Sequence, residues 1–115
     1  MECLTGKWRY KEEYDYGETV GELSLQQEGN RLSGKIIFTD RTIDGDSYMI
    51  REILSGTLDG RKIKLEAREL DVIHSEYPLQ YELDKWFGIW VDERTIIGLS
   101  MDAQGVEGFF TFEKE

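Results

Sequence analysis

Two glutamates are expected to place their carboxyl groups on the same strand face as apolar side chains. Glu12 alternates with Tyr10, and Glu52 alternates with Ile50 and Leu54. Since alternate residues of a β-strand point to the same face, both carboxyl groups are expected on apolar faces. Removal from water favours the protonated carboxyl, which can orient a polar or cationic ligand or act as a general acid. The alternative is that each glutamate lies at an open end of the fold, or beside a bulge that reverses its direction.

Aromatic residues follow the same alternation and offer an apolar surface next to these carboxyls. An apolar cavity with a few polar groups is the usual form of a small-molecule site. The same side chains would also fill the interior of a small barrel completely, so both interpretations stay open. Arg9 and Arg51 lie nearby in the chain and are expected to balance the two carboxylates. The residues expected to line the interior and contact a ligand are Trp8, Tyr10, Phe38, Tyr48, Tyr81, Trp86 and Phe110, with Glu12 and Glu52 as polar handles and Phe112 facing the same way.

Alternation with a period of two, interrupted by turn residues, predicts eight strands and very little helix. Short turns between consecutive strands favour antiparallel neighbours. Residues 40–46 are expected to form a polar loop, and residues 71–78 are the least regular stretch. The sixth strand is either one bent strand or two short ones. The expected strands are residues 4–14, 21–27, 31–39, 47–58, 61–70, 79–91, 95–101 and 106–114.

Glycine recurs inside these apolar runs, at Gly34, Gly56, Gly88, Gly98 and Gly108. Glycine weakens an ordinary strand, so its repetition indicates places where strands bend and backbones approach closely. This requirement is typical of a tightly coiled sheet. The predicted fold is all-β: an eight-stranded antiparallel up-and-down meander barrel formed by residues 1–115 as a single domain. A two-sheet β-sandwich is the alternative that the same pattern permits.

The segment Gly6-Lys7-Trp8 at the start of the first strand resembles the calycins, the group that contains lipocalins, fatty-acid-binding proteins and avidins. The resemblance implies that Trp8 closes one end of the barrel and that a basic side chain near the last strand packs across it. Lys114 is the residue in that position. It further implies an interior that holds a small ligand or is filled by its own side chains. The first loop lacks the asparagine and serine of avidin's biotin contacts, so biotin binding is not implied.

The charge balance argues against several classes of partner. Acidic residues number 24 and basic residues 14, which gives a net charge of −10. Such a surface repels phosphate backbones and anionic lipid, so neither nucleic acid nor a membrane is an expected partner. The chain has no apolar run of the ~18 residues that a membrane helix needs. Its N-terminus lacks the features of a signal peptide, so a cytoplasmic location is expected, unless an exported protein has lost its leader.

Metal and cofactor chemistry finds little support in the sequence. The single cysteine, Cys3, and the single histidine, His74, do not make a zinc site or an internal disulfide. The acidic stretch 40–46 lacks the ligand spacing of an EF-hand. His74 is expected to be exposed in a polar loop. We therefore expect no metal and no cofactor, and we assign no catalytic residue.

The segment from Trp86 to Val91 is apolar on both faces. If one face enters the core, then Phe87, Ile89 and Val91 form an exposed apolar strip on the other. A strip of this kind indicates a subunit interface, here a homodimer, or a surface covered by residues 71–78.

Three functions are compatible with these patterns. The first is a non-catalytic binding protein with a small apolar or amphipathic ligand in the barrel. The second is a protein–protein interaction or inhibitor module with a filled core. The third, which we regard as weaker, is an enzyme that uses an inward carboxyl group as an acid.

Overall fold

The computed structural model describes residues 3–14, 17–43, 45, 47–75, 83–103 and 105–115. These residues form eight strands and no helix, so none is a candidate to cross a membrane as a helix. The strands are β1 (Gly6–Tyr14), β2 (Gly17–Glu28), β3 (Arg31–Thr42), β4 (Ser47–Asp59), β5 (Lys62–Ser75), β6 (Asp84–Asp92), β7 (Thr95–Asp102) and β8 (Glu107–Lys114).

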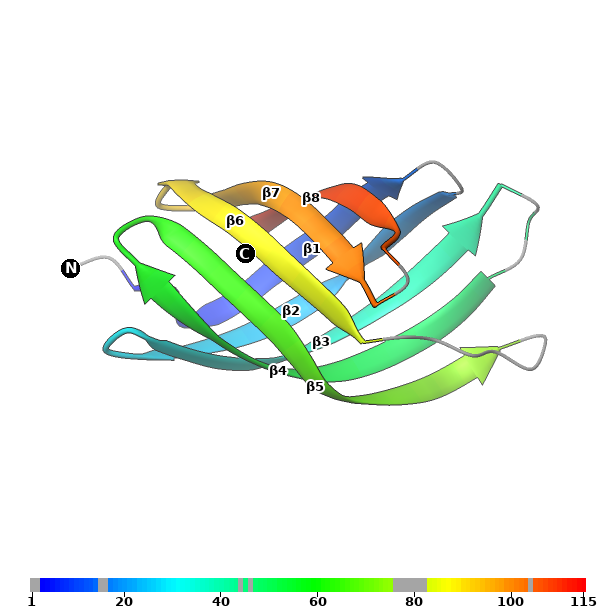
Figure 1. Ribbon diagram of the computed structural model, residues 1–115, viewed down its shortest axis with the longest axis horizontal. Helices are drawn as coiled ribbons and strands as arrows, with labels where there is room; N and C mark the ends of the chain where they lie inside the picture. The colour runs from blue at the N-terminus through cyan, green and yellow to red at the C-terminus, as the bar shows by residue number, and fades with distance from the viewer. Residues whose placement is uncertain (1–2, 15–16, 44, 46, 76–82, 104) are drawn as a thin grey trace.

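The strands form a closed barrel in which each strand pairs with the next in the chain, and β8 returns to β1 (Figure 1). The closing ladder is antiparallel and runs from Trp8 opposite Lys114 to Glu13 opposite Phe109. Closure removes both sheet edges, so the predicted up-and-down barrel is confirmed and the sandwich alternative is wrong. Because the strands alternate in direction, β1, β3, β5 and β7 all finish at one end of the barrel.

Alternation places one face of every strand inside the barrel. In β6, for example, Trp86, Gly88 and Trp90 are buried while Phe87, Ile89 and Val91 are exposed. The predicted facing of the aromatic residues therefore holds wherever the structure describes them. The fully enclosed side chains include Trp8, Trp86, Phe38 and Phe112, packed among leucines and isoleucines.

Two of the recurring glycines show why the pattern exists. A Cβ atom on Gly56 would overlap the carbonyl oxygen of Lys64 on β5. A Cβ atom on Gly98 would overlap the carbonyl oxygen of Phe87 on β6, where it pairs with another glycine, Gly88. Neighbouring backbones thus approach too closely for any side chain, as expected for a tightly coiled sheet.

Several strands are longer than the sequence pattern predicts. β5 continues to Ser75, so the expectation that residues 71–75 are irregular is wrong, and His74 is an exposed strand residue rather than a loop residue. The sequence pattern ends too early because β5 has two register shifts against β4, between Met49 and Ile50 and between Ile53 and Leu54. Each shift adds an unpaired residue to β5 and interrupts the alternation of inward and outward side chains. The period of two from which a strand is predicted is therefore lost over this part of β5.

Two boundary expectations near turns are also wrong. β3 continues through Asp40 to Thr42, so the first part of the expected loop is strand, and β2 already begins at Gly17. The sixth strand is described from Asp84 onward, so its expected start at residues 79–82 lies outside the described residues.

One end of the barrel, which we call the closed end, is where Trp8 and Trp90 lie. The Trp8 indole Nε1 donates to the carbonyl of Leu4 at 2.8 Å, and the Lys114 Nζ lies 5.6 Å from the Trp8 ring centroid. The basic residue that the calycin resemblance implied is therefore in place over the tryptophan. On the other side, Arg61 lies 5.8 Å from the ring centroid of Trp90. Both contacts are of the cation–π type.

The close backbone approach at Gly56 gives a test of the barrel geometry. We expect Gly56→Ala to lower the free energy of unfolding by about 1–3 kcal/mol or more, because the new methyl group meets backbone that cannot move aside. Thr57→Ala, at the adjacent exposed position, should change it by less than about 1 kcal/mol. Urea unfolding of both variants measures the difference. Equal stability of the two variants would show that the strands are not this close.

Candidate ligand-binding site in the barrel interior

Most of the aromatic residues singled out from the sequence lie inside the barrel. Trp8 belongs to the closed end, whereas Tyr10, Phe38, Trp86 and Phe110 are buried further along. Tyr48 is half-buried and packs against this core. Tyr81 lies outside the described residues, so its predicted place in the interior stays a prediction.

The middle of the barrel is filled by rings that pack on Tyr10. The ring centroid of Tyr10 lies 5.8 Å from that of Phe38, 6.2 Å from that of Trp86 and 5.3 Å from that of Phe112. The first two pairs are edge-to-face, a favourable arrangement for aromatic rings. This layer forms an apolar floor across the interior of the barrel.

Beyond this floor the interior becomes polar, at the end where the odd-numbered strands finish; we call this the polar end. Glu52 is fully buried there, and Glu12 is half-buried. The structure brings them together with several residues that the sequence analysis did not select. These additional inward-facing polar residues are Tyr14, Thr19, Asp40, Asp84 and Ser100.

Glu12 is held by hydrogen bonds that begin in the aromatic floor. The Trp86 indole Nε1 donates to the Tyr10 hydroxyl at 3.3 Å, and that hydroxyl donates to Glu12 Oε1 at 2.8 Å. The Ser100 hydroxyl also donates to the Glu12 carboxyl group. Burial raises the pKa of Glu12, although these two hydroxyl donors oppose the shift. Burial also raises the pKa of the Tyr10 hydroxyl, which remains a proton donor.

Asp40 is buried but fully supplied with donors. The hydroxyl of Tyr14 donates to its Oδ1, the hydroxyl of Tyr48 donates to its Oδ2 at 2.9 Å, and Thr19 supplies a further hydrogen bond. Burial raises the pKa of Asp40, and the three hydroxyl groups oppose that shift. Burial first, and then the Asp40 carboxylate, raise the pKa of both tyrosines. Asp40 therefore serves to hold Tyr14 and Tyr48 in place.

Glu52 is buried without such support. It has no exposed surface, and neither of its carboxyl oxygens has a side-chain hydrogen-bond donor among the residues that the structure describes. It lies close to Asp84, whose backbone N–H favours its ionised form and whose carboxyl group can share a hydrogen bond with it only if one of the two carries a proton. Burial first, and then the charge of Asp84, raise the pKa of Glu52 far above its usual range. The parity-reversal alternative for Glu52 is wrong, because both register shifts add residues to β5 rather than β4.

The arginines expected to balance these carboxyls do not reach them. Arg51 pairs with Asp71 at 2.5 Å, and Arg9 pairs with Glu113 at 3.5 Å, both on the outer surface. Each arginine is an odd number of residues from its glutamate along the same strand. Its side chain therefore points to the opposite face, which is the outer one. No ion pair found among the described residues involves Glu12, Asp40 or Glu52. The polar end is therefore acidic and lacks a balancing cation in the part of the chain that the structure describes.

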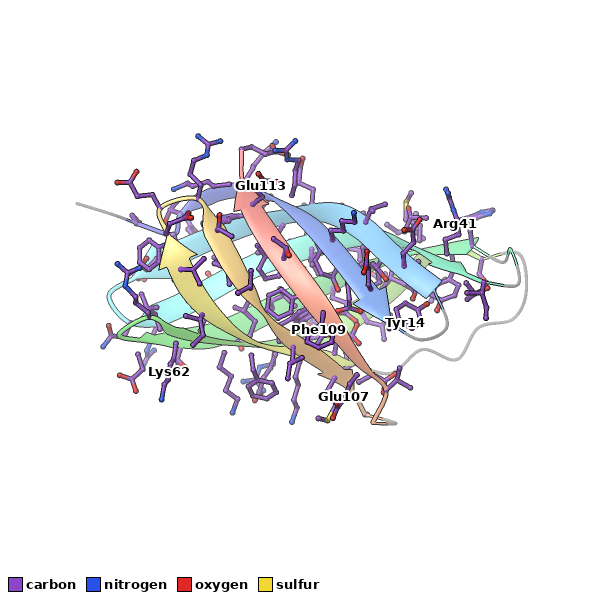
Figure 2. All side chains as sticks on the ribbon, turned by 90° about the horizontal axis from the view of Figure 1, so that it is seen from above. Tyr14, Arg41, Lys62, Glu107, Phe109 and Glu113 are labelled. Atoms are coloured by element: carbon purple, nitrogen blue, oxygen red, sulfur yellow. The ribbon has the colours of Figure 1, made fainter. Side chains whose placement is uncertain are left out.

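The rim of the polar end carries an open hollow of about 390 Å³. It lies where β1 gives way to β2 and where β3 ends, near Tyr14 and Arg41 in Figure 2. Tyr14 lines this hollow while its hydroxyl group reaches Asp40 inside. Tyr14 thus lies between this hollow and Asp40. The lining residues of the hollow are Glu13, Tyr14, Gly17, Glu18, Arg41, Thr42 and Ile43.

A metal centre is not evident in this arrangement. Within the described ranges, no three histidine, cysteine, aspartate or glutamate side chains converge as metal ligands. Cys3 is exposed near the opposite, closed end and donates to the Thr5 hydroxyl. The chemistry available at the polar end is instead that of carboxyl and hydroxyl groups beside aromatic rings, which suits recognition of a polar or cationic group.

The additional polar residues could have been predicted from the alternation of inward and outward side chains along each strand. Asp40 continues the inward series of Ile36 and Phe38, and Asp84 begins the inward series of Trp86 and Trp90. Thr19, Tyr14 and Ser100 extend their own strands in the same way. Extending each alternation past its last apolar residue would have found all of them.

Comparisons with known proteins bear on the fold. No known protein family and no curated protein matches the sequence. Among solved structures, the chain is similar to a redesigned β-barrel, mFAP1, bound to DFHBI, with a TM-score of 0.67, 12% identity, and coverage of 96% of this chain and 94% of that one. A second redesigned barrel bound to DFHBI, mFAP0, has a TM-score of 0.65 and 11% identity to this chain. That match covers 96% of this chain and 98% of the other.

A further similar structure is a de novo designed fluorescence-activating β-barrel, with a TM-score of 0.60, 15% identity, and coverage of 97% of this chain and 94% of that one. At such identities the likeness shows a common fold. It places the chain among small eight-stranded antiparallel barrels and assigns no family.

The buried carboxyls predict how stability depends on pH. Glu12, Asp40 and Glu52 have raised pKa values in the folded protein, so it binds more protons than the unfolded chain above the ordinary carboxyl pKa of about 4.5. The free energy of unfolding should therefore fall as pH rises from 5 to 8, by at most about 1.4 kcal/mol per pH unit for each carboxyl that stays protonated. Urea unfolding at several pH values measures this slope.

Glu52→Gln isolates the contribution of the least supported carboxyl. The variant should be more stable than the wild type at pH 8 and show a shallower slope, because the amide needs no proton. Glu69→Gln removes the same charge from an exposed site on the facing strand and should keep the wild-type slope. A Glu52→Gln slope that matches the Glu69→Gln slope would mean that Glu52 is solvated and ionised like a surface group.

Proposed function

We propose that this protein is a non-catalytic binding protein that holds a small amphipathic ligand at the polar end of its barrel. The observation that carries the proposal is Glu52, whose carboxyl group is fully buried and has no side-chain hydrogen-bond donor on either oxygen among the described residues. A buried polar group without a partner costs several kcal/mol of stability. A chain that retains such a group gains something other than stability from it, and a ligand's polar group would supply the missing partner.

The surroundings of Glu52 suit a molecule with one polar and one apolar part. Tyr10, Phe38 and Trp86 offer aromatic surface, whereas the carboxyl and hydroxyl groups of the polar end offer directed hydrogen bonds. This combination is the normal design of a small-molecule site. The DFHBI-bound barrels support the proposal, because they are barrels of this fold that hold a small molecule. The hollow beside Tyr14 gives a route of entry once that side chain turns aside.

The experiment is native mass spectrometry of the protein isolated from its own host, before and after denaturing extraction. We expect a reproducible extra mass that denaturation removes. Ser100→Leu should abolish it, because the larger side chain fills the interior beside Trp86. Ser24→Leu, on an outward position of β2, is the matched control and should retain the mass.

A second measurement covers a ligand that dissociates during isolation. Small-molecule extract from the host, added to purified protein, should raise the melting temperature of the wild type and of Ser24→Leu, but not that of Ser100→Leu. The proposal is overturned if the wild type carries no extra mass and the extract shifts the wild type and Ser100→Leu alike.

A second candidate function, association of two copies of this chain, is favoured by the outer face of β6, β7 and β8. The predicted strip of Phe87, Ile89 and Val91 is 42–45% exposed, and the Lys64 Nζ lies 6.0 Å from the Phe87 ring centroid at its border. Residues of β7 and β8 extend this strip into a continuous apolar face, since Ile89 pairs with Ile97 and Phe87 pairs with Leu99. Phe109, which pairs with Leu99 from β8, is 74% exposed. Apolar patches of this kind usually mark interaction surfaces.

Charges on the two sides of this face favour a second copy as its partner. Lys62 and Lys64 border it on β5, whereas Glu107 and Glu113 border it on β8; Figure 2 shows Lys62 and Glu113 on opposite sides. Lys64 also pairs with Glu66, and Glu113 with Arg9, within the chain. A two-fold axis that lies in the interface along the strands would bring the lysine border of each copy onto the glutamate border of the other. An axis across the strands would oppose like charges, so the first arrangement is the one we propose.

Ile89→Asp tests this interface. The wild type should show a concentration-dependent dimer in sedimentation experiments, and Ile89→Asp should be monomeric while keeping its barrel. Val20→Asp makes the same change at an exposed position on β2, outside this face, and should still dimerise. A monomeric wild type at millimolar concentration removes the dimer from consideration.

A further inference from the structure

The outer wall of the barrel carries a separate hollow of about 450 Å³ over β3, β4 and β5, which lie side by side (Figure 1). Along its floor, on β4, the outward side chains of Ser55 and Thr57 are short. Longer side chains flank this floor on both sides, namely Arg31 on β3, and Lys64, Glu66 and Arg68 on β5. The hollow therefore exists because short side chains lie between long ones, and its volume is that of a small-molecule site.

The lining of this hollow is basic although the chain as a whole is acidic. Three of its side chains are basic and one is acidic, which gives a net charge of +2, whereas the whole chain carries −10. The outward residues that face the lining from the next strands do not cancel this charge. Lys85 faces Glu66 from β6, and Glu28 faces Arg31 from β2, so together they add none. A region of positive potential within a negative surface attracts anions.

Glu66 shows how an anion is held on the β5 side of the hollow. One oxygen of its carboxylate lies 3.1 Å from the Lys64 Nζ, and the other lies 3.5 Å from a guanidinium nitrogen of Arg68. The Nε of Arg68 also donates to the Ser55 hydroxyl at 2.6 Å, which orients the guanidinium group. The hydrogen bond from Lys64 lowers the pKa of Glu66, so this carboxyl is ionised at neutral pH. The two cations are thus already arranged around an oxyanion that belongs to the chain.

Arg31, on the opposite side of the hollow, has no such anion. Its side chain is exposed, and no ion pair or hydrogen bond of its guanidinium group is found in the described part of the chain. A guanidinium group offers five N–H donors in a planar fork, which suits the oxygens of a phosphate group. Thr57 pairs with Arg31 across the β3–β4 ladder and places a hydroxyl group beside it. An anion in the hollow would therefore gain donors on both sides.

Charge and surroundings favour a small phosphate ester over other anions. A phosphate monoester carries about 1.5 to 2 negative charges at neutral pH and has three strong acceptor oxygens. This charge matches the net charge of the lining, and the oxygens match donors on both sides. The acidic remainder of the surface repels an anionic membrane and the phosphate backbone of a nucleic acid. A small soluble molecule brings one phosphate group without meeting that repulsion.

We propose that this hollow binds the phosphate group of a small soluble phosphate monoester, between Arg31 on one side and Lys64 and Arg68 on the other. The Thr57 hydroxyl donates to the same group. Glu66 competes with the ligand for the two cations of β5 and so limits its affinity. The site lies on the outer wall, so the inference is independent of the ligand proposed for the barrel interior.

The test is a titration of ¹⁵N-labelled protein with methyl phosphate at pH 8, followed through the backbone amide chemical shifts. We expect saturable shifts at the amides of Ser55, Gly56 and Thr57, with a dissociation constant in the millimolar range. Methyl sulfate, which has a similar shape and a single negative charge, should bind about threefold more weakly or worse. Added sodium chloride should weaken the binding of methyl phosphate, because these charges are exposed to solvent.

Two pairs of variants separate the site from general effects of charge. Arg31→Gln should weaken binding by about threefold or more, whereas Lys35→Gln removes the same charge from an exposed position of β3 outside the hollow and should have little effect. Glu66→Gln should strengthen binding by about threefold, because it removes the competing carboxylate. Glu69→Gln, at an exposed position of β5 outside the hollow, should bind as the wild type does.

Several outcomes would overturn this inference. One is the absence of saturable shifts at the three amides, and another is equal binding of methyl phosphate and methyl sulfate. Equal effects of Arg31→Gln and Lys35→Gln would show attraction to charge in general. Sedimentation of the protein with vesicles that contain phosphatidic acid, without binding of methyl phosphate, would point to a lipid surface instead. None of these results bears on the interior ligand, whose retention is tested by Ser100→Leu.

Discussion

Closure of β8 onto β1 is the constraint on which the rest of the structure depends. Once the sheet is closed, one face of every strand is enclosed, and each inward side chain must find its partners among other inward side chains. The small radius also forces backbones together, which is why Gly56 and Gly98 have no room for a Cβ atom. A polar side chain that points inward therefore cannot reach solvent at a sheet edge, and its hydrogen bonds must be made inside the barrel.

The two ends of the barrel meet this constraint in different ways. At the closed end Trp8 and Trp90 fill the interior, with Lys114 and Arg61 lying over their rings from outside. At the polar end carboxyl and hydroxyl groups take the inward positions, and the layer around Tyr10 divides the two. A barrel that needed only stability would be apolar throughout, because buried carboxyls weaken a fold. The asymmetry is the main reason to place function at the polar end.

Asp40 and Glu52 show how similar burial leads to different roles. Asp40 accepts hydrogen bonds from Tyr14, Tyr48 and Thr19, so its cost of burial is offset within the chain. Glu52 has no side-chain donor among the described residues and lies close to Asp84, whose carboxyl group is an acceptor like its own. The first group is part of the framework, whereas the second leaves a demand for a proton or a cation. Sites that recognise ligands often retain such unsatisfied groups at the expense of stability.

The sequence by itself determined an all-β fold of eight strands and favoured a barrel, because period-two alternation, short turns and glycines inside apolar runs are local properties of the chain. Closure of β8 onto β1 decided against the sandwich that the same pattern permits. The sequence also predicted that Phe87 faces outward, whereas the inward direction of Glu52 stayed open until the structure placed both register shifts on β5. It did not predict the length of β5, because two register shifts against β4 interrupt the alternation. Only the tertiary structure decided which inward acids have donors. Asp40 and Tyr14 are 26 positions apart in the chain, and Glu52 and Asp84 come from strands that are not neighbours, so their meeting depends on closure of the barrel.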